Sequence, residues 1–391
     1  MKLSGKRSMN SSPIYKRIIR QLDDRRGKNL FRRVVPYRNG TDKRIDCSTN
    51  SYLGLHANET VQTSALQLAE QSCSGNLASR LVATYSPLYE TLEKEIADWK
   101  QTETALVFNS GYTANVGIIQ ALCTRHTEVF CDRLNHASIY DGISLSGCRM
   151  TRYQHCDMAD LKTKLEQSSA TEKLIVTDTV FSMDGDCAPL ADIAELGKKF
   201  DALVMVDEAH ATGMFGKTGS GRVEATGTED GIAIRMGTLS KAIAGLGGYV
   251  ATEKTYRDYF VNFSRSLIYS TALPHSVLAH DLAAIRYIRS NPEIGVTLQQ
   301  KSAVFRQSLQ VLGYETTPST TQIIPSRMAN EAEAVALMEY FDENGVTVPA
   351  IRPPTVPAGT TRLRFSWSLI HSDDDREKIM DLLKTWRNRN G

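Results

Sequence analysis

Two short segments decide the fold of this chain: Asp207-Glu208-Ala209-His210-Ala211-Thr212-Gly213 and, after a Gly-rich stretch, Gly237-Thr238-Leu239-Ser240-Lys241-Ala242. The first segment follows the apolar run 202–206, which is typical of a buried strand. Its carboxylate therefore lies where that strand ends. An imidazole follows three residues later, and a single lysine follows the small hydroxyl residues of the second segment.

These side chains are the groups that hold pyridoxal 5'-phosphate. Lys241 offers an amine to the aldehyde, Asp207 an anion that keeps the pyridine nitrogen protonated, and His210 a hydrogen bond to the phenolic oxygen. Each group alone has a simpler interpretation, as a helix cap, a turn residue and a solvated lysine. Their occurrence together in this order favours the cofactor site.

Around these segments, short apolar runs alternate with amphipathic segments of helix length. This rhythm predicts an α/β fold with a mostly parallel sheet covered by helices on both faces. Ligands in such folds bind at the carboxyl ends of the strands, where Asp207 and Lys241 fall. The predicted strands are 105–108, 129–131, 174–177, 203–206, 232–236 and 249–251, and the predicted helices between them are 114–123, 158–167 and 190–200.

After Pro274 the pattern changes to long helices with few strands, which predicts a smaller α+β lobe that closes over the site. A length of 391 residues with 41% hydrophobic content suits one large domain and a smaller one. We expect an N-terminal arm and helix over 1–45, with the helix starting near Pro13, a large cofactor-binding domain over 46–275 and a small domain over 276–391. The predicted helices that open the small lobe are 276–288 and 297–312. They are followed by the segments 322–325, 331–343, 362–366 and 373–387, of which 362–366 is a predicted strand.

Charge and cysteine content narrow the class of protein. The 46 basic and 44 acidic residues are interspersed and leave a net charge of +2, which argues against nucleic acid or a membrane as the main partner. The chain has neither an apolar core typical of a secretion signal nor an apolar run long enough to span a bilayer. The seven scattered cysteines suggest neither a disulfide framework nor a zinc site. We expect a cytoplasmic enzyme without a metal, and interpret His155-Cys156 as a loop with a buried thiol.

A phosphate site is predicted where Asn109-Ser110-Gly111-Tyr112-Thr113 follows a strand and begins a helix. Free amide groups at a helix N-terminus and nearby hydroxyls bind phosphate, although a Ser-Gly pair is also an ordinary cap. Its position at the head of the β-α-β series favours the phosphate. Thr238 and Ser240 offer further hydroxyls.

Two other strand ends carry candidate residues. His136 follows one of them and could cover the face of the cofactor ring, although an isolated histidine there is more often structural. Ser182, in Phe181-Ser182-Met183-Asp184-Gly185-Asp186, could share the phenolic oxygen with His210. The two carboxylates beside Gly185 indicate a turn rather than a calcium loop. The glycines at 245–248 do not fit a dinucleotide-binding fingerprint, so a nicotinamide dehydrogenase is a distant alternative.

Together these motifs resemble those of the α-oxoamine synthases, fold-type I pyridoxal phosphate enzymes that condense an amino acid with an acyl thioester and lose carbon dioxide. The similarity runs from about Leu22 to the C-terminus. The strings 181–190, 267–271 and especially 351–360 (IRPPTVPAGT) are most similar to the branch that serves biotin biosynthesis. The resemblance implies a seven-stranded sheet in the large domain and a reaction between L-alanine and a pimeloyl thioester of coenzyme A or acyl carrier protein.

The resemblance also implies roles for individual residues. Lys241, Asp207, His210 and His136 would be catalytic, with His136 stacked on the ring and able to protonate the thioester oxygen. Ser270 and Thr271 would reach the phosphate of the neighbouring subunit, which implies a homodimer with shared active sites. The phosphate would lie among Ser110, Gly111, Tyr112 and Thr238, the phenolic oxygen would contact His210 and Ser182, and substrate carboxylates would meet Arg32, Asn50, Arg352 and Thr355, with Arg362 or Arg364 able to share that role.

One region departs from the family pattern. The Gly-rich loop of the family is here 74–80, with two glycines fewer, and Tyr89 replaces a histidine. Fewer glycines restrict the approach of an acyl chain to this backbone, so the acyl donor stays open. The alternatives are a sister activity, such as 2-amino-3-ketobutyrate ligase, 5-aminolevulinate synthase, serine palmitoyltransferase or an acyl-amino-ketone signal synthase, and a cofactor-binding paralogue without catalysis.

Overall fold

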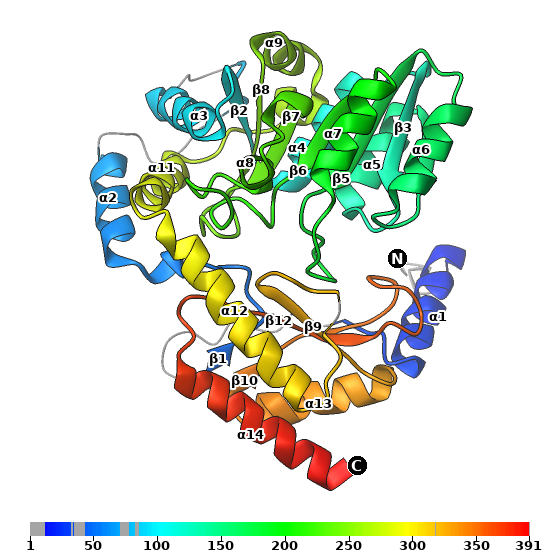
Figure 1. The fold of residues 1–391 in the computed structure, drawn as a ribbon, viewed down its shortest axis with the longest axis vertical. Helices are drawn as coiled ribbons and strands as arrows, with labels where there is room; N and C mark the ends of the chain where they lie inside the picture. The colour runs from blue at the N-terminus through cyan, green and yellow to red at the C-terminus, as the bar shows by residue number, and fades with distance from the viewer. Residues whose placement is uncertain are drawn as a thin grey trace, which may run out of the picture.

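The computed structural model describes residues 12–32, 34, 44–70, 78–82, 86–316 and 318–390. Within them the chain forms two lobes, joined in Figure 1 by the long helix α12. The larger lobe contains a seven-stranded sheet of order β2-β8-β7-β6-β5-β3-β4, in which β8 alone runs antiparallel to its two neighbours. Its strands are β2 (Thr104–Phe108), β3 (Thr127–Asp132), β4 (Arg149–Tyr153), β5 (Glu172–Asp178), β6 (Leu203–Asp207), β7 (Ile234–Thr238) and β8 (Gly248–Thr252).

The mostly parallel sheet of the predicted α/β fold is confirmed, and all six predicted strands are present. Their central residues form continuous apolar runs because helices cover both faces of the sheet. The strand β4 was not predicted. Its sequence, Arg-Met-Thr-Arg-Tyr, lies at the edge of the sheet, where only Tyr153 is buried, so it has no apolar run.

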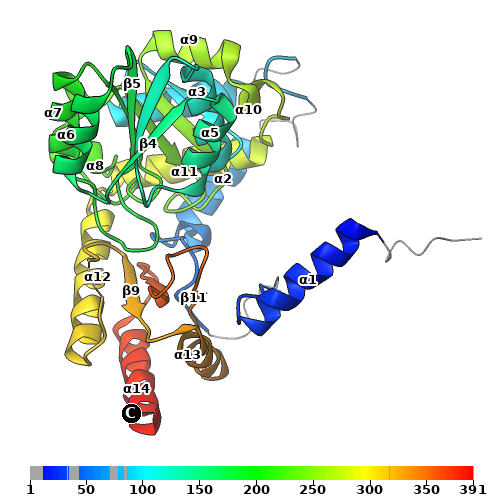
Figure 2. The same ribbon diagram turned by 90° about the vertical axis from the view of Figure 1, so that its right-hand side faces the viewer.

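Helices cover the large sheet on both sides, as Figure 2 shows in a second view. Buried side chains of α4, α5, α9 and α10 form one core with one face of the sheet. Those of α6, α7 and α8 pack on the other face, and α3 and α11 extend that layer toward the small lobe. These helices are α3 (Pro87–Lys100), α4 (Gly111–Leu122), α5 (Ala137–Ser146), α6 (Met158–Gln167), α7 (Leu190–Lys199), α8 (Arg222–Thr226), α9 (Lys254–Phe263), α10 (Arg265–Ile268) and α11 (His275–Ser290).

The small lobe is an α+β layer. A three-stranded antiparallel sheet, β11-β12-β9, and a parallel pair, β1-β10, pack against three helices. Its elements are β1 (Ile45–Asp46), α12 (Glu293–Val311), β9 (Ile323–Arg327), α13 (Glu331–Glu343), β10 (Val346–Thr347), β11 (Ala350–Ile351), β12 (Arg362–Ser366) and α14 (Asp373–Asn390).

Besides α12, the segment between β1 and α2 also connects the lobes. After β1, the backbone continues along the small lobe, where Cys47 O accepts from Ser366 N at 2.8 Å and Tyr52 O from Leu369 N at 2.9 Å. It then enters α2 (Glu59–Glu70), which packs against α11. The two lobes consequently share one hydrophobic core. The predicted domain boundaries at 46 and 276 stay a prediction.

The first helix, α1 (Pro13–Gly27), begins at Pro13 as predicted, with Ser12 as its cap. None of its residues is buried, and Figure 2 shows it projecting away from both lobes. Its apolar side chains Ile14, Tyr15, Ile18 and Ile19 are therefore exposed. In the described part of the chain, no helix combines the length and apolar character needed to cross a membrane.

Candidate active site

The candidate site lies where the strands of the large sheet end. Asp178 and Asp207 are the last residues of the neighbouring parallel strands β5 and β6, and Lys241 follows the end of β7 by three residues. His136 follows the end of β3 and begins α5. The parallel strands thus bring side chains from distant parts of the sequence to one edge of the sheet.

Lys241 and His210 are in direct contact. The Lys241 Nζ atom lies 2.9 Å from His210 Nε2, and the Tyr52 hydroxyl lies 2.7 Å from His210 Nδ1. Burial lowers the pKa of Lys241 to about 8, although Asp207 and Asp178 oppose that shift. Burial and the charge of Lys241 also hold the pKa of His210 well below its usual value. Near neutral pH, His210 is therefore uncharged and a fraction of Lys241 is present as the free amine.

Asp207 is buried and fixed on both carboxylate oxygens. Its Oδ1 accepts from Ala209 N at 2.8 Å, and its Oδ2 accepts from Asn115 Nδ2 at 2.8 Å. Asn115 also donates to the Ser138 hydroxyl at 2.9 Å. Asn115 was not predicted as a site residue. A polar residue on the otherwise apolar side of the helix predicted over 114–123 could have indicated it.

Asp178 is a second buried carboxyl group that was not predicted. Its Oδ2 accepts from His136 N at 2.8 Å, which fixes the start of α5. Burial and the nearby Asp207 raise the pKa of Asp178 well above its usual range. Burial also lowers the pKa of His136, which favours its uncharged form.

The predicted phosphate turn forms a complete capping box at the start of α4. Ser110 Oγ accepts from Thr113 N at 3.1 Å, and Thr113 Oγ1 accepts from Ser110 N at 3.0 Å. A Cβ atom on Gly111 would lie 3.3 Å from Thr238 Cβ, so glycine lets this helix end approach the Thr238 hydroxyl. That hydroxyl lies 2.9 Å from the hydroxyl of Ser240. Tyr112 is half-exposed, and its hydroxyl donates to Asp141.

These residues fit pyridoxal 5'-phosphate. The site supplies a buried amine with a lowered pKa, a fixed carboxylate, a neutral histidine, and a helix N-terminus flanked by hydroxyls. An amine is needed for the aldehyde, an anion for the pyridine nitrogen and free amides for the phosphate.

Arg364 is the arginine that lies in this site. Its Nε donates to Ser182 O at 2.6 Å, and its two terminal nitrogens lie 3.3 Å from Asn50 Oδ1. Arg362 instead forms a buried ion pair with Asp184. The structure thus brings Asn50, Ser182 and His210 together around Arg364, which the sequence had offered only as an alternative to Arg362.

The other predicted substrate residues form a second cluster. Arg32 donates to the Thr355 hydroxyl at 2.6 Å, and Arg352 donates to Asn29 O. Burial and the positive charge of Arg32 lower the pKa of Arg352. Two arginines close together make this cluster suited to an anion.

Ser270 and Thr271 lie beside the phosphate turn of their own chain, since Thr271 O accepts from Asn109 Nδ2 at 2.6 Å. Tyr89, which replaces the family's histidine, fixes the same segment through Leu273 N, which donates to its hydroxyl at 2.7 Å. Residues 74–77 of the divergent loop lie outside the described residues. Arg80, from the end of that loop, pairs with Glu93 at 2.6 Å and packs over the ring of Tyr89.

A groove of about 1340 Å³ lies elsewhere, at the opposite end of the large sheet. Thr127, Glu172 and Leu203, at the starts of three strands, line it together with α7. None of the predicted site residues lines it. Because ligands of open α/β sheets bind at the carboxyl ends of strands, we place the chemistry at the Lys241 edge.

Comparisons with known proteins show the family and the fold of this chain. Residues 42–383 match the family model of class I and II aminotransferases. The 8-amino-7-oxononanoate synthase of Trichlorobacter lovleyi is 46% identical over 346 residues, which cover 87% of this chain and 88% of that relative. A structure of SPT with a PLP internal aldimine superposes with a TM-score of 0.89 and 27% identity, covering 97% of this chain and 98% of the other. The 8-amino-7-oxononanoate synthase of Francisella tularensis gives a TM-score of 0.76 and 26% identity, covering 89% and 99%.

Proposed function

The chain belongs to the class I and II aminotransferase family, and from that premise we propose that it condenses L-alanine with a pimeloyl thioester to form 8-amino-7-oxononanoate, carbon dioxide and the free thiol. Its cofactor is pyridoxal 5'-phosphate, and the reaction is a step of biotin biosynthesis. One observation carries the proposal: the contact between Lys241 and His210 beside Asp207 occurs in a chain that is 46% identical to an 8-amino-7-oxononanoate synthase over nearly its full length.

When bound, pyridoxal 5'-phosphate supplies an electron sink for the negative charge that develops at the amino acid's α-carbon. Asp207, fixed by Asn115, would hold the pyridine nitrogen and keep a proton on it. Lys241 Nζ would hold the aldehyde, and its lowered pKa would let the free amine move a proton at the α-carbon near neutral pH. His210 and Ser182 would orient the phenolic edge, and His136 would cover the ring and could protonate the thioester oxygen.

Two groups of arginines suit two carboxylates. We assign Arg364 and Asn50 to the carboxylate of L-alanine, because they lie beside Lys241 and His210. We assign the cluster of Arg32, Arg352 and Thr355 to the distal carboxylate of the pimeloyl chain. Arginine forks bind carboxylates in bidentate fashion, which makes both assignments chemically specific.

A sister activity is the second candidate, because the SPT structure superposes with a TM-score of 0.89. The Arg32 and Arg352 cluster favours a pimeloyl over a palmitoyl chain. The pimeloyl chain ends in a carboxylate that can pair with the arginines, whereas the apolar end of a palmitoyl chain would desolvate them without pairing. The identity of 46% to an 8-amino-7-oxononanoate synthase, against 27% to SPT, points the same way.

The proposal includes a homodimer with shared active sites, in which Ser270 and Thr271 of one subunit reach the phosphate bound by the other. The exposed apolar face of α1 and the exposed Tyr269 beside Ser270 support it, since both would be covered by a second copy. We further propose a cytoplasmic location. Six cysteines of the described residues carry free thiols, which suits a reducing compartment.

The test is a substrate panel. L-Alanine, glycine and L-serine are added separately to the purified, cofactor-loaded protein while the visible spectrum is recorded, and thiol release is then followed with pimeloyl, acetyl and palmitoyl thioesters. We expect L-alanine and the pimeloyl thioester to give the strongest response, and the Lys241→Ala variant to give none. A preference for L-serine with palmitoyl-CoA would replace the proposal by the second candidate.

A further inference from the structure

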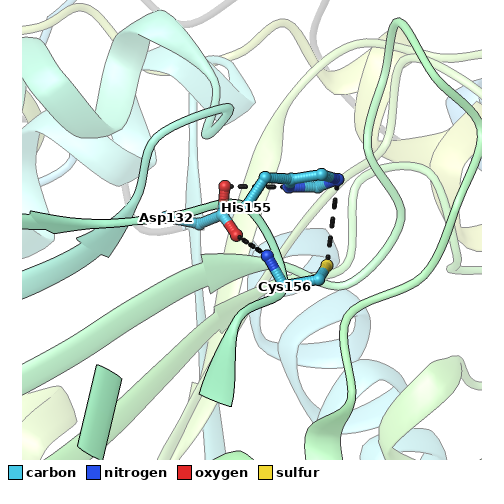
Figure 3. Close-up of side chains that lie close together, drawn as sticks. All are labelled: Asp132, His155 and Cys156. Atoms are coloured by element: carbon cyan, nitrogen blue, oxygen red, sulfur yellow. Dashed lines mark hydrogen bonds and ion pairs between the residues drawn. The ribbon is translucent and has the colours of Figure 1, made fainter. Parts of the chain in front are cut away.

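His155 lies between two carboxylates next to the candidate site and takes no part in the proposed mechanism. Its Nδ1 lies 3.0 Å from Asp132 Oδ1, and its Nε2 lies 2.7 Å from Asp186 Oδ2. Figure 3 shows the imidazole beside Asp132 and the adjacent Cys156. Asp132 ends β3 and Asp186 belongs to the turn that follows Ser182, so His155 joins two separate segments.

The group of Asp132, His155 and Cys156 is close enough together to suggest a metal ligand set. The contacts of His155 argue for a different role. Both ring nitrogens face carboxylate oxygens, so neither has a lone pair free for an ion. Burial alone would lower the pKa of His155, but the hydrogen bonds to Asp132 and Asp186 outweigh it and raise the pKa to about 12. His155 is therefore an imidazolium that is bonded on both sides.

The segment 181–187, which we call the Ser182 turn, is tied to the large lobe through His155. Besides the Asp186 bond, the ring of Phe181 meets the imidazole edge to face, with centroids 4.4 Å apart and planes at 88°. The turn is closed internally by Phe181 N donating to Asp186 O at 3.0 Å and Gly185 N donating to Phe181 O at 2.9 Å. Movement of Asp186 would therefore be transmitted to Phe181 and Ser182.

The opposite side of the Ser182 turn is tied to the small lobe. Asp184 pairs with Arg362, and Gly185 O accepts from Thr320 N at 3.1 Å. Ser182 O accepts from Arg364 Nε at 2.6 Å. The turn thus connects the lobes, and its position fixes the guanidinium that we assign to the L-alanine carboxylate.

The positive charge on His155 balances the negative charges of Asp132 and Asp186. Asp132 is almost fully buried and already accepts from Leu134 N and Cys156 N, both at 2.8 Å. Asp186 has one buried oxygen without a hydrogen-bond partner among the described residues. A neutral side chain at 155 would leave two carboxylates near each other without an intervening cation, and Asp186 would be drawn toward solvent.

We propose that His155 is a positioning residue, whose imidazolium fastens the Ser182 turn to the end of β3 and so places Ser182 at the phenolic edge of the cofactor and Arg364 at the substrate carboxylate. The inference rests on the proposed function only in requiring pyridoxal 5'-phosphate as cofactor. It does not depend on which acyl thioester is used.

The test compares His155→Gln and Asp186→Asn with the matched control His126→Gln, which changes an exposed histidine whose ring accepts from its neighbour Arg125. Each apoprotein is titrated with pyridoxal 5'-phosphate while the visible spectrum is recorded, and Ser182→Ala serves as reference. We expect both variants to bind the cofactor about tenfold more weakly than wild type, with a shift of the absorption maximum in the same direction as in Ser182→Ala. The double variant should be no weaker than either single one, because the two residues act as one unit.

If His155→Gln does not fold, Asp186→Asn still tests the inference. This variant keeps the pairing of His155 with Asp132 and removes only the negative charge at 186. Cofactor affinity and spectrum equal to those of His126→Gln in both variants would overturn the inference while leaving the proposed function intact. One zinc per purified chain, whose chelation weakens cofactor binding to the same degree, would overturn it in favour of a metal site. A wild-type chain that binds no pyridoxal 5'-phosphate would overturn the proposed function and this inference together.

Discussion

Lys241 owes its chemistry to its surroundings more than to its identity. A solvated lysine is almost fully charged near neutral pH, whereas burial lowers the pKa of Lys241 to about 8. His210, which contacts Lys241, is uncharged, so the pKa of Lys241 is lowered by burial and not by a positive charge on this histidine. Capture of the aldehyde needs the free amine, so the environment of one side chain sets the pH at which the cofactor is bound.

This leads to a prediction about cofactor capture. Below the pKa of Lys241 the free-amine fraction falls about tenfold per pH unit, so the rate at which the apoprotein captures pyridoxal 5'-phosphate should rise with pH and level off near 8. Stopped-flow absorbance at fixed cofactor concentration measures that rate. A small alkylamine serves as control, because its rate should keep rising well above that pH. A protein rate that rises in parallel with the control would contradict the lowered pKa.

A short sequence motif predicts which residues a side chain contacts only when those residues are close to it in the sequence. Lys241, Asp207 and His210 could be found because each follows a recognisable strand end. Tyr52 could not, because its contact with His210 spans 158 positions. Arg362 and Arg364 show the same limit: residues two apart in a strand point to the same face, so alternation cannot distinguish them. Only the placement of β12 decides that Arg364, and not Arg362, lies beside Asn50.

Helix α4 shows how one element serves both stability and binding. Its capping box satisfies amide groups that the helix itself leaves free, and its N-terminus points to the proposed phosphate site. The sequence predicted the helix from its apolar side and a phosphate turn from residues 109–113, with an ordinary cap as the alternative. It predicted interior strands for the same reason and missed β4, because an edge strand is exposed on much of its surface and need not be apolar.

Ser110→Ala removes both the cap of α4 and one of the hydroxyls at the proposed phosphate site. Loss of the cap should lower the free energy of unfolding of the apoprotein by about 1 kcal/mol, and loss of one hydroxyl at a charged group should weaken cofactor binding by roughly tenfold or more. Urea unfolding and cofactor titration measure the two effects. Ser86→Ala is the matched control, since Ser86 is likewise an N-cap, of α3, where its hydroxyl accepts from Leu88 N. Equal cofactor affinity in the two variants would place the phosphate elsewhere.

The two lobes act together because the site belongs to both. Lys241, Asp207 and His136 come from the large sheet, whereas Arg364 and Gln322, whose Nε2 donates to His210 O at 3.1 Å, come from the small lobe. The shared core holds these parts in one arrangement. The sequence predicted each lobe and a small lobe that closes over the site. It did not predict which side chains make the contact, because packing between lobes depends on side chains more than a hundred residues apart.

Sharing of active sites between subunits leads to the last prediction, tested by complementation. Lys241→Ala and the double variant Ser270→Ala/Thr271→Val should each have low activity, because the first lacks the amine and the second the hydroxyls offered to the partner's phosphate. After subunit exchange in mild denaturant, a mixed dimer has one site with Lys241 from one chain and Ser270 and Thr271 from the other. Random exchange of equal amounts makes about one quarter of all sites complete, so thiol release should recover toward that fraction of wild-type activity. Copurification through two different tags verifies that the mixed dimer has formed. Mixed dimers without recovered activity would mean that Thr271 serves the phosphate turn of its own chain, where its carbonyl contacts Asn109.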